Sequence, residues 1–336
     1  MTGSRIYKIM IAGLLIIIPA GLLNAQQKPV FSQYMMNKFL INPAFAGNSG
    51  HTSVNLTARQ QYSGFANPPR TFLLSGQTRL LEDSWILRVR KVRKKTTQAS
   101  RSQNVGLGGY IYNDRNGLIS RTGFQLTYAY HINFKNAYQL SFGLSGSGFQ
   151  YKLDATDATL THPDDPLLLN AKNTFFVPDA NAGIYISGRG FYSGLSITEL
   201  FGSYVKLGKN KFENYKTLRH FYLITGYKIA VSNYIILEPS FLAQATIDNF
   251  QLDISTRVFY LRNYWIGFTY RTNNTLVSMV GFKYDGLFFG YAYDANLSNM
   301  RSYGGGSHEL MLEYRIGSSN TRRARWLRPD VSEIGE

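Results

Sequence analysis

The chain has 336 residues, no Cys and a formal net charge of +16, together with 24 Tyr, 22 Phe and 31 Gly. The absence of Cys excludes disulfides and thiolate metal sites as sources of stability. A composition rich in aromatic residues and Gly but poor in charge favours a membrane β-barrel with aromatic girdles, with a soluble β-sandwich as the alternative.

The first 25 residues have the pattern of a signal peptide. Arg5 and Lys8 form a basic region before the apolar run at 9–18, and this run is short for a membrane span. Ala25 then offers a cleavage site. We therefore predict a signal peptide over 1–25, against the alternative of a retained N-terminal anchor. The residue after the cut is not Cys, so a lipoprotein is not expected.

Residues 26–50 are apolar without the alternation of a strand. The stretch QYMMNKFLINPAFAG, residues 33–47, contains an Asn-Pro step that forces a turn, because the residue before Pro avoids the helical region. The segment is too apolar to hang in the periplasm. We expect it to tuck into the mouth of a barrel as a plug or clasp; an ordered lead-in to the first strand is the alternative.

From residue 51 onward, apolar and polar residues alternate along long runs, most clearly at 137–149, 248–259 and 307–316. Successive side chains of a strand point to opposite faces, so one face is apolar and the other carries amides, hydroxyls and charges. The runs span about nine to thirteen residues, which is longer than a typical soluble strand and sufficient to cross a membrane. Strands can cross lipid only as a closed barrel, because every backbone group needs a partner.

We predict an all-β fold, a transmembrane antiparallel β-barrel over residues 51–317 with fourteen strands, an even number as in bacterial outer-membrane barrels. The predicted ranges are 51–61, 70–80, 103–112, 118–131, 137–149, 180–188, 190–199, 218–230, 232–244, 248–259, 263–272, 275–284, 286–294 and 307–316. With both termini in the periplasm, the long connections at 150–179, 200–217 and 295–306 face outside.

Two basic segments fall on the predicted periplasmic side, an insertion at 88–101 and a C-terminal tail at 318–336. They are candidates for docking an acidic partner or lipid headgroups, with a solvated insertion as the alternative. Their basic residues are Arg88, Arg90, Lys91, Arg93, Lys94, Lys95, Arg322, Arg323 and Arg325. Nucleic acid is not an expected partner, because these residues form no aromatic platform within the sheet.

Eight charged residues occupy polar positions of the predicted strands. They are Arg59, Arg79, Glu238, Asp253, Arg257, Glu309, Glu313 and Arg315. We expect them to face the barrel lumen, because Arg or Lys on the lipid face would cost about 2–4 kcal/mol at the midplane. The lumen would then be either a selective pore or a salt-bridged interior that maintains the barrel shape.

The sequence contains no G-x-S-x-G, H-E-x-x-H or P-loop motif. His131 and His220 fall on polar faces, but no nucleophile, base and orienting group can be assembled around them from spacing. Asp164 and Asp165 could hold Ca²⁺, although they also fit the tip of a surface loop. We therefore predict no catalytic residue, metal or cofactor.

Three stretches, residues 31–47, 58–80 and 106–132, resemble the PorP/SprF family of type IX secretion-associated outer-membrane proteins. The matching residues are Gln33, Tyr34, Asn37, Asn42, Pro43, Ala44, Ala46 and Gly47, then Arg59, Gln60, Pro69 and Thr71, then Gly106, Gly108, Asp114 and Gly117. In the predicted plug, the resemblance singles out Gln33, Tyr34, Asn37, Asn42, Pro43, Ala44 and Gly47.

The resemblance implies a non-enzymatic barrel of the type IX secretion and gliding apparatus. Its expected partners are a secreted adhesin with a type B C-terminal domain, periplasmic or peptidoglycan-associated components of the apparatus, and outer-membrane lipid. The barrel would help to export the adhesin or anchor it at the cell surface. A porin-like or hydrophobic-solute diffusion channel is the alternative function.

Overall fold

The computed structural model describes residues 31–64, 67–80, 104–117, 119–134, 137–153, 174–202, 204–207, 213–297 and 305–316. The predicted signal peptide, the basic insertion at 88–101, the tail at 318–336 and the Asp164–Asp165 pair lie outside these residues. Within the described part of the chain, no helix has the length and hydropathy that a membrane span requires.

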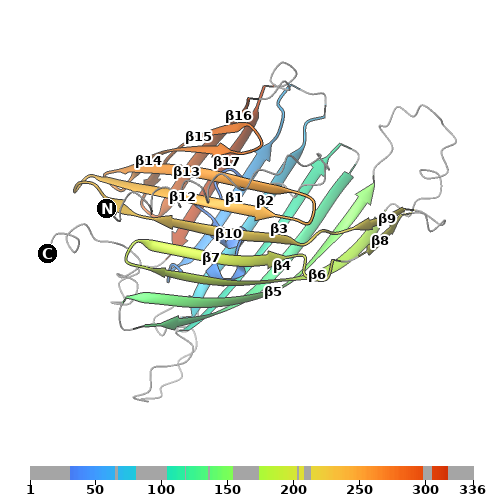
Figure 1. The fold of residues 1–336 in the computed structure, drawn as a ribbon, viewed down its shortest axis with the longest axis horizontal. Coiled ribbons are helices and arrows are strands. Elements are labelled where there is room, and N and C mark those ends of the chain that lie inside the picture. The colour runs from blue at the N-terminus through green and yellow to red at the C-terminus, as the bar shows by residue number, and fades with distance from the viewer. Residues whose placement is uncertain are drawn as a thin grey trace, which may run out of the picture.

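Fourteen antiparallel strands close into a barrel (Figure 1), which confirms the predicted fold. The strands are β1 (Thr52–Gln60), β2 (Arg70–Leu80), β3 (Val105–Asn116), β4 (Ile119–Asn133), β5 (Tyr138–Leu153), β6 (Thr174–Gly188), β7 (Phe191–Thr198), β10 (His220–Tyr227), β12 (Ile235–Ala245), β13 (Phe250–Tyr260), β14 (Tyr264–Arg271), β15 (Thr275–Tyr284), β16 (Leu287–Asn296) and β17 (Ser307–Ile316). The short β11 (Ile229–Ala230) continues β10 after a break at Lys228.

Each strand pairs with its neighbours in sequence, and the first strand pairs with the last. The closing seam joins β1 to β17 from Thr52 opposite Ile316 to Gln60 opposite His308. Closure gives every ladder group a partner, which lipid demands. Along β4, Leu126 is 68% exposed and faces outward, whereas its neighbours Gln125 and Thr127 are buried in the lumen. The alternation in the sequence therefore separates a lipid face from an interior face.

The two ends of the barrel differ in their connections. At the end where β1 begins and β17 ends, most links are short, such as 189–190 and 285–286; we call this the turn end. The opposite loop end carries the long links at 154–173 and 199–219. Short periplasmic turns and long extracellular loops are typical of outer-membrane barrels.

Two predicted loops were wrong in extent. The loop predicted at 150–179 is shorter, because β5 and β6 remain paired as far as Lys152 opposite Thr174. β6 begins at Thr174 rather than at residue 180 and contains Pro178, a residue that is uncommon inside strands. The connection predicted at 200–217 contains a small hairpin, β8 (Tyr204–Leu207) and β9 (Glu213–Lys216), which forms a separate sheet.

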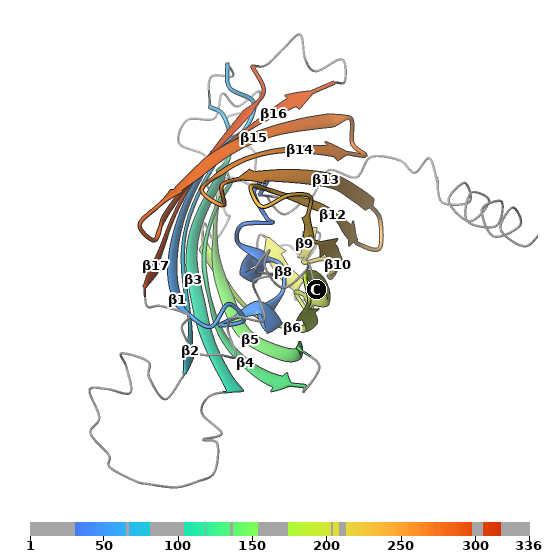
Figure 2. The same ribbon diagram turned by 90° about the vertical axis from the view of Figure 1, so that its left-hand side faces the viewer.

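Residues 31–50, the N-terminal segment, run through the inside of the barrel (Figure 2). The segment contains two short 3₁₀ helices, η1 (Lys38–Leu40) and η2 (Pro43–Phe45). Asn42 caps η2, since its side-chain oxygen accepts a hydrogen bond from the Ala44 N–H, and Pro43 fits the first helical position. The Asn-Pro step therefore makes the turn that the sequence predicts.

Candidate functional site: the lumen around the N-terminal segment

Glycines in the barrel wall allow the N-terminal segment to approach the strand backbones. A Cβ placed on Gly143 of β5 would lie 2.5 Å from the Ala44 Cα, and one on Gly108 of β3 would lie 2.7 Å from the Phe39 ring. A Cβ on Gly106 would overlap the Ala46 carbonyl. A residue with any side chain would displace the segment at these positions, because such separations lie far inside van der Waals contact.

Asn42 fixes the segment to the wall between β6 and β7. Its amide nitrogen donates to the carbonyls of Ile184, at 3.0 Å, and Leu195, at 3.1 Å. Its amide oxygen is used within the segment by the Ala44 N–H at 2.9 Å, and the side chain is fully buried. The position therefore requires two donors and one acceptor on a short side chain, which asparagine supplies and aspartate does not.

His131 of β4 also contacts the N-terminal segment. We call the inner-wall residues that contact this segment the docking surface. Its Nε2 lies 2.9 Å from the Ala46 carbonyl and its Nδ1 lies 2.7 Å from the Ser141 Oγ. The Nε2 contact therefore holds the segment, while the Nδ1 contact to β5 fixes the orientation of the ring. The other histidine on the polar face, His220, is buried with its Nδ1 3.5 Å from Glu199.

A buried charged network joins the start of the segment to the closing seam. Glu309 of β17 accepts from the backbone N–H groups of Ser32, at 2.7 Å, and Gln33, at 2.9 Å. Arg59 of β1 donates to Glu309 at 3.1 Å and to Asp294 of β16 at 2.7 Å. The Ser32 hydroxyl bonds to Asp294 and receives a bond from Arg59. Two carboxylates, one guanidinium, the Ser32 hydroxyl and two backbone N–H groups of the segment thus form one hydrogen-bonded network.

A second charged cluster surrounds Lys38, which is buried in η1. Its Nζ lies 3.7 Å from Glu238 of β12 and 3.6 Å from the ring centroid of Tyr192. Glu238 also accepts from Arg257 at 2.9 Å and from the Tyr192 hydroxyl at 2.9 Å. Burial lowers the pKa of Lys38 to about 7, while the nearby Glu238 carboxylate acts in the opposite direction.

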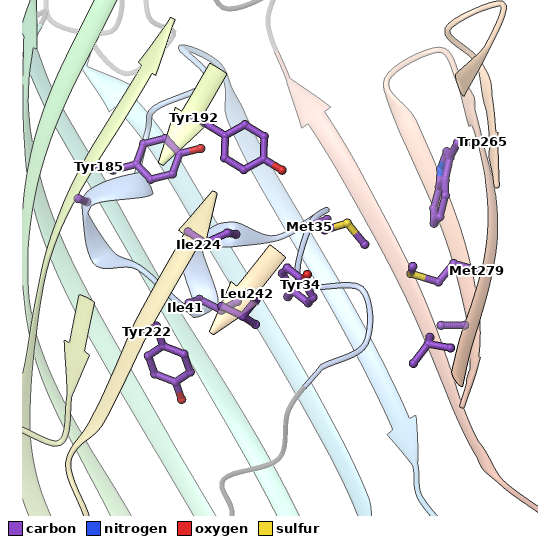
Figure 3. Packing of buried hydrophobic residues seen from close by; sticks show 13 residues of the cluster. Tyr34, Met35, Ile41, Tyr185, Tyr192, Tyr222, Ile224, Leu242, Trp265 and Met279 are labelled. Atoms are coloured by element: carbon purple, nitrogen blue, oxygen red, sulfur yellow. The ribbon is translucent and has the colours of Figure 1, made fainter. Parts of the chain in front are cut away.

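Apolar contacts complete the docking surface. Figure 3 shows Tyr34 and Met35 of the segment between Tyr185 and Tyr192 on one side and Trp265 on the other. Tyr34 is 1% exposed, and its hydroxyl lies 2.9 Å from the Ser255 Oγ of β13. The side chains that the sequence marks as too apolar for the periplasm are therefore buried against the inner wall.

The N-terminal segment lies between two cavities of different character. The loop-end cavity, of about 80 Å³, is mainly apolar and lined by tyrosines and aliphatic residues, with Asp114 and Arg121. The turn-end cavity, of about 250 Å³, has a cationic and aromatic lining. Residues of the segment contribute to both linings, among them Tyr34 on the loop side and Lys38 on the turn side.

The structure places the eight predicted lumen charges inside the barrel and brings most of them into pairs. Arg59 meets Glu309, Arg257 meets Glu238, and Arg315 meets Glu313 at 2.7 Å. Asp253 pairs with Arg271 at 3.1 Å, and Arg79 donates to Gln139 at 2.8 Å. Seven of the eight are buried, and Arg315 is partly exposed.

Sequence reasoning missed Lys38, Arg271 and Asp294. Arg271 and Asp294 occupy inward positions of strands whose outward residues are aromatic, such as Tyr270 and Tyr293. The alternation that identified the other charges could therefore have identified these two. Nothing in the local sequence around Lys38 predicts its burial, since the contact with Glu238 joins segments 200 residues apart.

The residues that carry the family resemblance meet around the segment. Asn42 and Ala46 bond to the wall, and Gly106 and Gly108 lie under the segment. Gly47, with φ +69°, stands where a Cβ would lie within 3.0 Å of the backbone of β3. The Thr71 hydroxyl donates to Asp114 at 2.6 Å across β2 and β3. The separate motifs of the sequence therefore describe one docking surface.

The fold and the lumen together define a transmembrane outer-membrane β-barrel protein in which residues 31–50 lie in the barrel interior. Residues 23–314 match the family described as "Type IX secretion system membrane protein PorP/SprF". The chain belongs to this family and is a type IX secretion outer-membrane barrel. No curated protein matches the chain.

Several solved structures are similar in fold. The toluene transporter TbuX of Ralstonia pickettii is 9% identical, with a TM-score of 0.46, over 86% of this chain and 94% of that one. The CymD monoaromatic hydrocarbon channel is 9% identical, with a TM-score of 0.46, over 90% and 95%. The toluene transporter TodX of Pseudomonas putida is 8% identical, with a TM-score of 0.44, over 83% and 93%.

Proposed function

We propose that the protein is a non-enzymatic barrel that binds a secreted adhesin through its type B C-terminal domain, helps to export it and anchors it at the cell surface. The observation that carries this proposal is the N-terminal segment, which is bonded to the lumen wall on β4, β6, β7, β13, β16 and β17. An interior built around its own chain favours an interaction scaffold over an open pore.

In this proposal the two ends have different partners. The loops at the loop end hold the adhesin domain outside the cell. The turn end faces the periplasm, where the basic insertion at 88–101 and the tail at 318–336 dock components of the type IX apparatus or lipid headgroups. The N-terminal segment acts as the plug between the two ends. The predicted signal peptide directs the chain to export and is removed.

Deletion of the gene tests the main proposal. We expect a single large adhesin to disappear from the cell surface, as measured by mass spectrometry of shaved surface proteins, while general outer-membrane content stays unchanged. An unchanged surface proteome would contradict the proposal.

Deleting residues 88–101 tests the proposed periplasmic docking. We expect the deletion to remove proteins that co-purify with the barrel from detergent-solubilised membranes. An unchanged set of co-purifying proteins would contradict the docking role of this insertion.

A hydrophobic-solute channel is the second candidate function, because the loop-end cavity is apolar and lined by Tyr110, Tyr112 and Tyr222. Such a channel would pass aromatic solutes in a liposome uptake assay without any change to the chain. The plug proposal instead predicts little conductance in planar bilayers until residues 26–47 are deleted. Stable conductance of the intact protein would favour the channel.

A further inference from the structure

The turn-end cavity, called here the vestibule, carries a large excess of positive charge. Five cationic side chains line it, Lys228, Arg257, Arg262, Lys283 and Arg315, together with Lys38, whose pKa is lowered to about 7 by burial. Behind the lining, Glu238 accepts from Arg257 at 2.9 Å and lies 3.7 Å from the Lys38 Nζ, so the positive charge that remains unpaired in the cavity comes mainly from the other side chains. Among the described residues, Glu313 is the one carboxylate in the lining, and it is already bonded to Arg315 at two positions, 2.7 and 2.9 Å. A concave site with one sign of charge and low-dielectric walls concentrates anions.

Aromatic rings lie among these cations. The Arg315 guanidinium carbon lies 3.6 Å from the ring centroid of Phe288, and Lys283 lies 5.4 Å from the same ring. Arg257 lies 5.1 Å from Phe259 and 5.9 Å from Trp265. The lining therefore offers apolar surface beside Arg257, Lys283 and Arg315, which suits a chain of mixed acidic and apolar side chains rather than a bare inorganic ion.

Three buried donors of the vestibule lack hydrogen-bond partners within the described residues. They are the Trp265 Nε1 and the Arg257 Nε, on residues that are both 3% exposed, and the hydroxyl of the buried Ser187. A buried donor without an acceptor is unfavourable, and an anionic ligand would supply one. This observation is independent of the charge count and points to the same class of ligand.

We propose that the vestibule is a binding site for an acidic polypeptide segment of a periplasmic partner. The site opens inside the barrel at the turn end, where lipid headgroups outside the barrel wall do not reach. Its volume of about 250 Å³ exceeds what a phosphate ion needs and accommodates several side chains. The inference deepens the proposed function, on which it rests for the periplasmic orientation, by naming the chemistry of the partner.

The test uses the purified full chain in detergent and a short fluorescent peptide of alternating Glu and Phe, with a Lys-Phe peptide as the charge-reversed probe. Fluorescence anisotropy should detect the acidic peptide alone, with an affinity that falls as salt rises. Substituting the rim residues Lys228→Gln, Arg262→Gln and Lys283→Gln together should weaken binding at least about tenfold. These side chains are partly or fully exposed, so the barrel should fold normally.

The matched control removes the same charge at the loop end with Arg70→Gln, Arg115→Gln and Lys152→Gln, all exposed. Unchanged binding in this control supports the site. Three results would each overturn the proposal. The two triple variants could lose affinity for the acidic peptide equally, the Lys-Phe peptide could bind as well, or a low concentration of inorganic phosphate could displace the acidic peptide completely. Binding that emerges only after Asp330→Asn, Glu333→Gln and Glu336→Gln would assign the vestibule to the chain's own tail and also overturn the proposal.

The outcome is separable from that of the proposed function. Failure of peptide binding with normal loss of an adhesin in the deletion strain would remove only the vestibule inference. Peptide binding together with an unchanged surface proteome would contradict adhesin anchoring while leaving the acidic-peptide site intact.

Discussion

Replacing Gly143 by alanine should release the N-terminal segment without damaging the barrel. The new Cβ would stand 2.5 Å from the Ala44 Cα and still closer to the Ala44 nitrogen and the Pro43 carbonyl carbon, whereas ordinary contact begins near 3.4 Å, so this part of the segment must withdraw by at least about 0.9 Å. A shift of this size stretches the two wall bonds of Asn42 from 3.0 and 3.1 Å toward about 4 Å, which ends them. Overpacking of this kind costs about 1–3 kcal/mol, so the undocked population should rise about 5- to 150-fold.

Trypsin provides the assay, because Lys38 is the sole Lys or Arg in residues 31–50 and is buried when the segment is docked. Cleavage after Lys38, followed by mass spectrometry, should accelerate by the same factor as the undocked population. Gly146→Ala is the matched control on the same strand, since a Cβ there meets nothing within 4 Å. Equal cleavage rates for the two variants, with both barrels intact by heat-modifiability on gels, would refute the reasoning.

Three further predictions concern the polar contacts of the segment. Asn42→Ala should speed cleavage after Lys38 at least about tenfold, because it removes two wall bonds and the η2 cap, and an unchanged rate would contradict the role of Asn42. Arg59→Met should reduce the free energy of unfolding by about 3–5 kcal/mol and lower the thermal midpoint measured by circular dichroism, because it leaves two buried carboxylates without their cationic partner. Arg115→Met on the exposed surface should have little effect on the midpoint. The pKa of Lys38 is lowered to about 7 when the segment is docked. Above pH 7 the undocked segment therefore binds more protons than the docked one, so docking should become more favourable as pH rises from about 7 toward 10. Wild-type thermal midpoints should therefore increase over this range relative to Lys38→Met, and parallel pH profiles would contradict the assignment.

The barrel was predictable because its physics is local. Lipid on one side and a polar interior on the other impose a period of two on every strand, which can be counted from the sequence. The fourteen predicted strands correspond to the observed ones, with ends that differ by up to six residues, as at β6, which begins at Thr174 rather than 180. The β8–β9 hairpin was missed because it lacks the long alternation that lipid imposes.

The docking of the N-terminal segment was less predictable. Its apolar composition indicates burial, and the Asn-Pro step indicates a turn, but neither specifies which strands receive it. The wall glycines show the difficulty: Gly143 of β5 and Gly267 of β14 both face the lumen, yet a Cβ on Gly143 would meet Ala44 of the segment, whereas one on Gly267 would meet Arg257 and Met279 of the wall. That distinction depends on strand direction, register and the three-dimensional path of the chain. The pairing of lumen charges depends on the same register, as with Asp253 and Arg271 opposite each other on β13 and β14.

The network around Ser32 has a consequence for biogenesis. Arg59 and Glu309 belong to β1 and β17, the two strands that close the barrel, and residues 32–33 bridge them from within: the two backbone N–H groups donate to Glu309, and the Ser32 hydroxyl accepts from Arg59. Threading of the leading residues and completion of the first-to-last strand ladder are thus thermodynamically linked, so each makes the other more favourable. The machinery that inserts this chain into the membrane would therefore release a closed barrel most readily when residues 32–33 are already docked inside it.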